Sequence, residues 1–494
     1  MNGRMHLVFG LALFAFVIDL AFAANGGPYF ATGIKIGEVT PTSAIVWARL
    51  TRDAAHVPAD APVPRIVYHG PDGATADEPP SRRDPNWKPD VRYPDGATVE
   101  TIAGAAPGAD GEVRIRYKRE DDSTWSETAW TRVNPGHDFT CAVKLSGLLP
   151  ASRYALAVDS RDSTGRAGMT AEGRFRTAPR EDAADKVVFT VTTCQGYNDQ
   201  DAPGGGFKMY DAMLKLGPDF FVHTGDILYY DPTAKSEALA RWNWQRMYSL
   251  PTNVNFHRQV ASYFIKDDHD TWQNDCWPTM GGSFMGEFTF AQGQAIFLEQ
   301  VPMSESTYRT FRWGRDLQIW LVEGRDYRSA NTDPDGPDKT IWGAEQKAWF
   351  KRTVSDSDAT FRVLLSPTPI VGPDRENKND NHANRGFAHE GRELRQFIAQ
   401  QHNMIVICGD RHWQYVSVDR DTGVREYSCG PASDEHAGGW PPNERRPEHR
   451  YLNVIGGFLA VTVEREAGFP RMMLRHHSVD GIVLNEDRIE ANGA

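Results

Sequence analysis

Four runs of residues that could bind metals or exchange protons lie in the second half of the chain. In chain order they are Thr193-Cys194-Gln195, Gly225-Asp226-Ile227-Leu228-Tyr229, Asp267-Asp268-His269-Asp270 and Gly409-Asp410-Arg411-His412. Carboxylates gathered at one place repel each other unless a cation neutralises them, because burying an unpaired charge is costly. If the fold brings the four runs together, a site for more than one metal ion is the simplest interpretation.

Each run directly follows an apolar segment with the pattern of a buried strand, at 187–193, 220–223, 263–266 and 405–408. Helical patterns occur between and around them, near 207–216, 235–249, 343–354 and 387–401, with further strands at 317–328, 361–371 and after 415. This alternation predicts an α/β domain over 181–494 with partly parallel sheets. Ligands of such sheets gather beyond the carboxyl ends of the strands, so we expect the four runs to converge on one crevice.

Residues 24–180 have the pattern of a separate, all-β domain. Apolar and polar residues alternate in two short runs over 30–50, joined by a Pro-Thr-Ser turn, which is typical of a hairpin. Residues 139–178 show the same alternation of apolar and polar residues and resemble a fibronectin type III sandwich. The stretch between them, 53–136, is rich in Pro, Gly and charge, and we interpret it as a long insertion with one clear strand at 111–120.

The first 23 residues are predicted to be a secretory signal. Arg4 supplies positive charge, an apolar stretch follows, and Ala21-Phe22-Ala23 forms a cleavage motif. The apolar stretch contains Asp19 and is short for a membrane anchor, so we expect no transmembrane span in the mature chain. The predicted location is periplasmic or secreted. The chain has five cysteines, an odd number, so at least one is unpaired or serves another purpose.

The composition narrows the class of protein. Hydrophobic residues make up 40% of the chain, which is enough for several buried cores and excludes a wholly disordered protein. Lys and Arg number 54 against 66 Asp and Glu, for a net charge of −12. A general nucleic-acid-binding protein needs a basic surface, so nucleic-acid binding is not expected.

Taken together, the four runs resemble the alkaline phosphatase D family of the calcineurin-like metallophosphoesterases. In that family the corresponding strands end in Ser-Cys-Gln, GDxxY, DDHE and GDxH, and their order matches this chain throughout 186–412. The resemblance implies a metallophosphoesterase-type two-sheet sandwich flanked by helices. It also implies a small immunoglobulin- or fibronectin-like sandwich before the catalytic domain.

The resemblance also implies a metal centre. Its Fe³⁺ site would use Cys194, Asp226, Tyr229 and His412, and its Ca²⁺ site would lie near Asp226, Asp268 and Asp410. Three anionic ligands suit a trivalent ion, and Ca²⁺ prefers carboxylate oxygen. The spacing of these residues alone does not distinguish Fe and Ca from Zn, Mn or Mg.

Two further residues are candidates for catalysis. His269 could contact phosphate or protonate the leaving group, and its alternative is a structural histidine beside carboxylates. Arg325 could clamp phosphate in a bidentate fork, and its alternative is a salt bridge with Glu323 or Asp326. Asp231 is interpreted as the N-cap of the helix predicted near 235–249.

Some positions depart from the family's pattern. The third run ends in Asp270 where the family has Glu, and Glu323 replaces an aspartate. The n-region has only Arg4 where relatives carry a twin-arginine signal. Residues 379–391 also differ, so substrate contacts from that loop are not transferred.

These features predict an exported, metal-dependent phosphoesterase that hydrolyses phosphate esters with a metal-activated hydroxide. The substrate would be a small-molecule or lipid phosphate ester, and the oligomeric state is not predicted. A phosphodiesterase or phospholipase D-like activity is the alternative within this class. A non-catalytic surface protein that binds through the β-sandwich is the alternative outside it, but it predicts missing ligands, and every motif position is filled.

Overall fold

The computed structural model describes residues 26–94 and 96–491. The predicted signal segment, 1–23, lies outside the described residues. Within the described part of the chain, no helix has the length and apolar character needed to cross a membrane.

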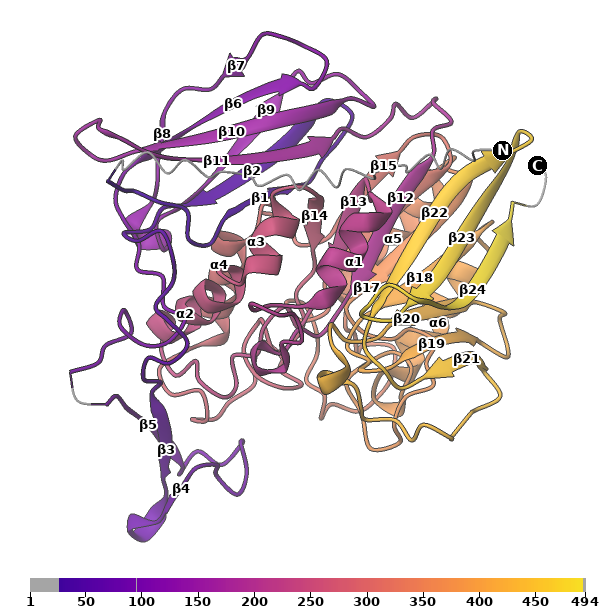
Figure 1. Cartoon of the computed structure of the whole chain (residues 1–494). Coiled ribbons are helices and arrows are strands. Elements are labelled where there is room, and N and C mark those ends of the chain that lie inside the picture. The colour runs from indigo at the N-terminus through magenta and orange to yellow at the C-terminus, as the bar shows by residue number, and fades with distance from the viewer. Residues whose placement is uncertain (1–25, 95, 492–494) are drawn as a thin grey trace, which may run out of the picture.

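Two large β-sheets form the centre of the molecule (Figure 1). The first contains nine strands: β1 (Ile34–Gly37), β2 (Ser43–Arg49), β9 (Thr140–Ser146), β12 (Val187–Thr192), β13 (Phe220–His223), β14 (Ala261–Phe264), β22 (Phe458–Glu466), β23 (Phe469–His477) and β24 (Val483–Glu490). Their spatial order is β24-β23-β22-β12-β13-β14-β1-β2-β9. The strands β12, β13 and β14 are parallel neighbours, as the alternating pattern of strands and helices predicted.

The second sheet contains seven strands: β15 (Arg309–Trp313), β16 (Leu317–Leu321), β17 (Phe361–Ser366), β18 (Met404–Cys408), β19 (Gln414–Val418), β20 (Arg425–Cys429) and β21 (His449–Asn453). Their spatial order is β15-β16-β17-β18-β20-β19-β21. The central strands β16, β17 and β18 are parallel to each other, and antiparallel strands complete both ends.

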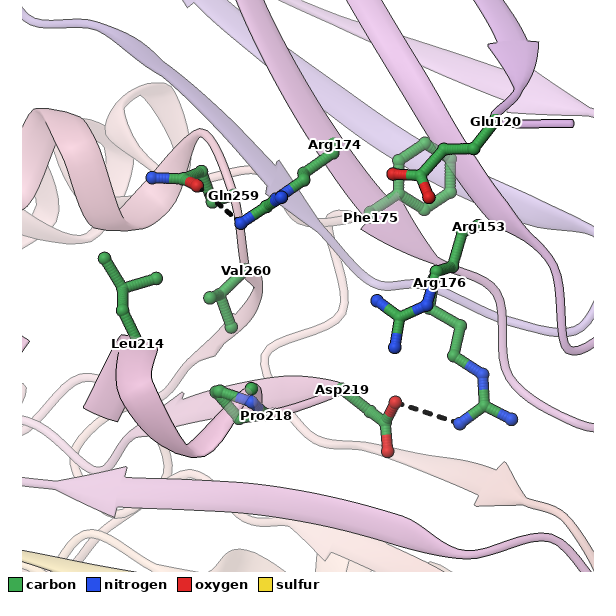
Figure 2. Close-up of a pocket in the computed structure, with 11 residues that line it drawn as sticks. Glu120, Arg153, Arg174, Phe175, Arg176, Leu214, Pro218, Asp219, Gln259 and Val260 are labelled. Atoms are coloured by element: carbon green, nitrogen blue, oxygen red, sulfur yellow. Dashed lines mark hydrogen bonds and ion pairs between the residues drawn. The ribbon is translucent and has the colours of Figure 1, made fainter. Parts of the chain in front are cut away.

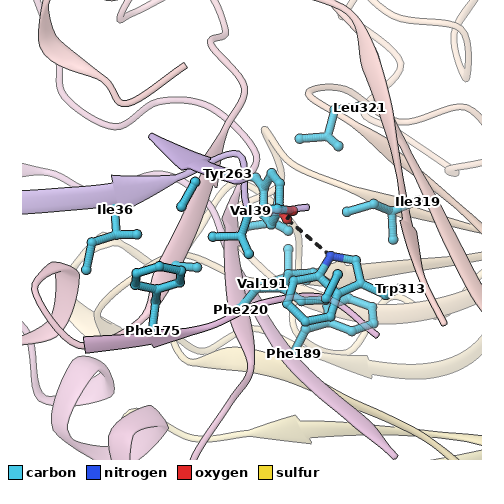
Figure 3. Packing of buried hydrophobic residues seen from close by; sticks show 14 of the residues in the cluster. Ile36, Val39, Phe175, Phe189, Val191, Phe220, Tyr263, Trp313, Ile319 and Leu321 are labelled. Atoms are coloured by element: carbon cyan, nitrogen blue, oxygen red, sulfur yellow. Dashed lines mark hydrogen bonds between the residues drawn. The ribbon is translucent and has the colours of Figure 1, made fainter. Parts of the chain in front are cut away.

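A shared hydrophobic core joins the two sheets. Successive side chains of a strand point to opposite faces, so each strand contributes alternate residues to this core. In β16, Ile319 points into this core, whereas Trp320 packs on the other side with the helices. Figure 3 shows the centre of the core, where Phe220 of the first sheet lies 4.6 Å from Trp313 of the second, between ring centroids. The Trp313 Nε1 donates to the Tyr263 hydroxyl at 3.1 Å. The indole N–H of Trp313 and the hydroxyl of Tyr263 are therefore hydrogen-bonded to each other inside the core.

Helices cover the outer faces of both sheets. Four pack near the first sheet: α1 (Lys208–Leu216), α2 (Glu237–Tyr248), α3 (Pro251–His257) and α4 (Phe290–Gln300). Two cover the second sheet: α5 (Gly343–Ser355) and α6 (Ala388–Ala399). The predicted two-sheet sandwich flanked by helices is therefore confirmed. The helices α1, α2, α5 and α6 were predicted, whereas α3 and α4 were not.

A smaller β-sandwich precedes this region. One of its layers is a sheet of β6 (Glu112–Arg119), β7 (Ser126–Glu127), β8 (Thr131–Arg132), β10 (Arg153–Arg161) and β11 (Ala167–Arg176). The other is β1, β2 and β9, which also continue the first large sheet because β1 pairs in parallel with β14. The strand β6, although it falls within the stretch interpreted as an insertion, pairs along its whole length with β10.

Polar contacts also join the small sandwich to the rest of the chain. Figure 2 shows a cavity of about 120 Å³ at this junction, where Arg174 donates to Gln259 and Arg176 to Asp219. The cavity is lined by none of the predicted site residues among those described.

A three-stranded sheet projects from the N-terminal region (Figure 1). It consists of β3 (Arg65–His69), β4 (Thr75–Ala76) and β5 (Lys88–Arg92), and we call residues 65–92 the arm. One side of the arm packs on the loop before α4, where Tyr68 stacks on Phe284 with ring centroids 5.3 Å apart. The Ser283 hydroxyl donates to the Trp87 carbonyl at 2.6 Å. The arm is therefore attached to the region that carries the four motif runs.

Candidate metal centre

The four runs converge, as their positions after strands predicted. Three of them follow the parallel strands β12, β13 and β14, and the fourth follows β18 of the facing sheet. The runs come from both sheets, so the site lies at one end of the two-sheet sandwich.

Three groups of potential ligands result, and within each group the ligand atoms lie within 4.8 Å of one another. The groups are Cys194, Asp226 and His412; Asp226, Asp268 and His269; and Asp226, Asp267 and Asp410. Asp226 belongs to all three groups. Tyr229 lies beside the first group, with its hydroxyl 3.5 Å from His412 Nε2.

Three of the predicted ligands have an unusual backbone conformation. Cys194, Asp226 and Asp410 have φ angles of 50°, 54° and 60°, in the left-handed region that few residues other than glycine adopt. Hydrogen bonds hold these turns: Cys194 N donates to Gly225 O at 3.1 Å, and Asp410 N to Thr193 Oγ1 at 3.2 Å. Such strain is concentrated at functional sites, where it sets the direction of the side chains.

The glycine before Asp226 allows two runs to approach each other. Gly225 has a φ of 108°, and a Cβ there would lie 2.6 Å from the Cβ of Asp267. The third run is also tied to the second through Asp270, whose carboxylate accepts from Asp267 N at 2.6 Å and Ile227 N at 3.0 Å. The shorter Asp270, where the family has Glu, thus holds the backbone of both runs.

The electrostatics of the centre fit a cationic group. Burial, and then the neighbouring Asp226, raise the pKa of the Cys194 thiol well above its usual value. Burial, and then Asp268, likewise raise the pKa of Asp226. Among the described residues, Asp226 Oδ1, Asp267 Oδ2 and Asp268 Oδ1 are buried and have no hydrogen-bond partner. Bound cations would both stabilise these anions and satisfy the unpartnered oxygens.

Arg325 lies deeper than a phosphate clamp requires. It is fully buried, and its Nε donates to Asp267 Oδ1 at 2.5 Å. Neither predicted salt bridge is present, because Glu323 and Asp326 both bind Lys266 instead. Burial raises the pKa of Asp268, but Arg325, His269 and the Asp275 N–H together outweigh it, and the pKa lies well below its usual range. Arg325 therefore acts as the counter-charge of the third run.

His269 lies at the edge of the centre and contacts Asp231. Its Nδ1 is 2.9 Å from Asp231 Oδ2, and its ring is 4.4 Å from that of Tyr229 between centroids. The prediction that Asp231 caps the following helix is wrong. Ser236 is the N-cap of α2, and its side chain accepts from Leu239 N.

Two residues that sequence reasoning missed complete the site. His436 Nε2 lies 2.7 Å from the Tyr229 hydroxyl, and His436 Nδ1 lies 2.7 Å from Asp199 Oδ2. The rings of His436 and His412 are 4.3 Å apart between centroids. No motif surrounds either residue, so only the fold reveals that His436 contacts the predicted ligand Tyr229 and that Asp199 contacts His436.

A cavity of about 220 Å³ opens beside this group. Its lining includes Tyr229 and His436 on the side of the centre and Asn243 and Arg246 of α2 on another. The cavity therefore offers space for a small organic group next to the candidate ligands.

The fold and the convergent ligand runs define a metallophosphoesterase. The model of the PhoD-like phosphatase family matches residues 189–440, just over half of the sequence, and the chain belongs to this family. It is thus a metal-dependent hydrolase of phosphate esters.

Solved structures agree with this fold. A structure of PhoD is similar with a TM-score of 0.68 and 15% identity, over 94% of this chain and 92% of that one. Purple acid phosphatase PPD1 from yellow lupin (Lupinus luteus) seeds has a TM-score of 0.59 and 13% identity, over 94% of this chain and 75% of that one. No curated protein matches the sequence significantly.

Proposed function

We propose that this chain is an exported phosphatase that hydrolyses small-molecule or lipid phosphate esters at a centre of Fe³⁺ and Ca²⁺. The observation that carries the proposal is the position of Asp226. Its carboxylate is a member of all three groups of potential metal ligands. A shared carboxylate between two sets of ligands is what a centre with two ions requires. Export is proposed from the first 23 residues, with a periplasmic or secreted location.

The two sets of ligands differ in chemistry, which supports different ions. Cys194, Asp226, Tyr229 and His412 would hold Fe³⁺, because thiolate, carboxylate and phenolate together supply three negative charges. Asp226, Asp268 and Asp410 are proposed for Ca²⁺, which prefers oxygen ligands. Asp226 lies near Asp268 in one group of potential ligands and near Asp410, together with Asp267, in another.

When bound, the ions supply Lewis acidity toward the phosphoryl oxygens and lower the pKa of a water molecule. The chain's own residues supply the proton for the leaving group, balance charge at the centre and bind the organic part of the substrate. His269 is placed at the edge of the centre to give a proton to the leaving oxygen. Arg325 lies against Asp267 and Asp268 and offsets part of their negative charge. The cavity lined by Tyr229 and His436 receives the organic part of the substrate.

We also propose the division of the mature chain into a β-sandwich domain, 24–180, with an insertion at 53–136, and a catalytic domain, 181–494. The sheet shared by β1 and β14 makes the two a single structural unit at that edge.

The experiment that tests this function measures metal content and hydrolysis together. We would purify the wild type, Cys194→Ala and the control Cys141→Ala, whose cysteine is half-buried on β9. We expect about one iron per chain and hydrolysis in the wild type and the control, and loss of both in Cys194→Ala. Iron that is retained in Cys194→Ala would refute the thiolate ligand.

The same preparations decide between the ester classes. The monoester p-nitrophenyl phosphate is compared with the diester bis-p-nitrophenyl phosphate and with phosphatidylcholine vesicles. Faster cleavage of the monoester supports the phosphatase proposal, and faster cleavage of either diester supports the phosphodiesterase or phospholipase D-like alternative. No hydrolysis after reconstitution with iron and calcium would overturn both.

A further inference from the structure

The arm reaches the edge of the metal centre through one side chain. Arg82 Nη1 lies 3.1 Å from Asp231 Oδ2, the same oxygen that lies 2.9 Å from His269 Nδ1. The second Nη of Arg82 binds Glu78 at 2.7 Å within the arm. Arg82, Asp231 and His269 thus form a continuous chain of contacts from an N-terminal element to a residue of the third run.

The position of Arg82 is set by packing rather than by this ion pair alone. The Arg82 guanidinium lies 4.8 Å above the Phe284 ring, and that ring stacks on Tyr68 of the arm. Lys235 Nζ lies 4.0 Å over the same ring and donates to the Asp231 carbonyl at 2.6 Å. Both the arm and Lys235, which binds the Asp231 backbone, therefore contact the same aromatic ring, that of Phe284.

Arg82 is the cation that holds the Asp231 carboxylate in place. The Asp231 side chain is 4% exposed, and its Oδ2 accepts from Arg82 at 3.1 Å and from Asn274 N at 3.3 Å, with His269 Nδ1 at ion-pair distance. The other oxygen, Oδ1, has no hydrogen-bond partner among the described residues. Without Arg82, only a long backbone contact would remain to orient a nearly buried carboxylate toward His269.

We propose that Arg82 is a positioning residue of the active site: it fixes Asp231, which in turn fixes the imidazole of His269. Contact through Nδ1 leaves Nε2, on the opposite side of the ring, for the leaving group. The arm is thereby part of the catalytic apparatus. This inference rests on the proposed function for the role of His269 as proton donor.

The test compares Arg82→Ala with a matched control on the same arm. Arg65→Ala also removes an arginine paired with an aspartate, because Arg65 binds Asp77 at 2.8 Å, but both side chains are exposed. Arg82→Lys, which keeps the charge, serves as the rescue variant. Each variant is assayed on p-nitrophenyl phosphate, with a good leaving group, and on phenyl phosphate, with a poor one. Crystal structures and metal content are determined for the same preparations.

In Arg82→Ala we expect kcat on phenyl phosphate to fall about tenfold or more, because general acid catalysis matters most for a poor leaving group. On p-nitrophenyl phosphate, kcat should fall much less, with KM unchanged. In the crystal structure, the His269 ring should turn away from Asp231. Metal content and melting temperature should equal those of Arg65→Ala, and Arg82→Lys should recover most of the activity on phenyl phosphate.

A His269 ring that stays on Asp231 in Arg82→Ala would overturn the proposal, as would an equal loss on both substrates accompanied by loss of metal. The crystal structures decide the positioning role even if the wild type cleaves neither ester. In that case the proposed function fails, whereas a turned His269 ring still supports the contact chain from the arm.

Discussion

Replacing Arg49 by alanine should destabilise the junction between the β-sandwich and the helical layer. Arg49 of β2 is fully buried and makes a two-bond pair with Asp138, with Nε and Nη2 each 2.8 Å from a carboxylate oxygen. The Asp138 carboxylate also accepts from Gln245 of α2 at 3.1 Å and from Gln300 of α4 at 3.2 Å. A single carboxylate therefore links a sandwich strand to two helices.

The magnitude follows from what the substitution leaves behind. Removing one partner of a buried pair costs about 3–5 kcal/mol, because the remaining charge is buried without compensation. The two glutamine amides still solvate Asp138, so we expect a loss in the free energy of unfolding near the lower end, about 3 kcal/mol. The double variant Arg49→Met, Asp138→Asn removes both charges and should recover part of this loss.

Urea unfolding followed by fluorescence measures the effect. The control is Arg132→Ala, whose ion pair with Asp110 lies on the surface with its side chain 66% exposed, and which should leave the urea midpoint unchanged. If the double variant is as unstable as Arg49→Ala, the cost does not come from an uncompensated charge and the reasoning is wrong.

Two further predictions follow from the site and its surroundings. Gly225→Ala should lose bound metal, measured as metal per chain, because its Cβ would lie 2.6 Å from that of Asp267. The control is Gly423→Ala, because a Cβ at Gly423 would meet open space. Full metal occupancy in Gly225→Ala would contradict the close-approach argument. Burial lowers the pKa of Lys235 from 10.5 to about 7, so unfolding takes up a proton and the contribution of Lys235 to stability rises between about pH 7 and 10.5. Lys235→Met should flatten this rise in urea midpoints, and an unchanged slope would count against a buried, neutral lysine.

The comparison of sequence and structure is clearest in the helices. The helices α1, α2, α5 and α6 have recognisable polar and apolar patterns, and all four were predicted near their observed bounds. The helix α4 was missed. It is capped by Thr289 and Gln292, whose side chains bind each other's backbone, and its buried face packs in the core with α2. Its stability depends on that packing as much as on its own residues.

By itself, the sequence determined the strands, the four runs that follow them and hence the class of chemistry, because strand periodicity and ligand type are local properties. Tertiary structure alone decided which distant groups meet those runs. Arg82 meets Asp231 across 149 positions of sequence, and His436 meets Tyr229 across 207. It also decided that Arg325 is a buried counter-charge and that β1 extends the first large sheet. The physical reason is that such contacts depend on how sheets, helices and loops pack, and no local pattern records that packing.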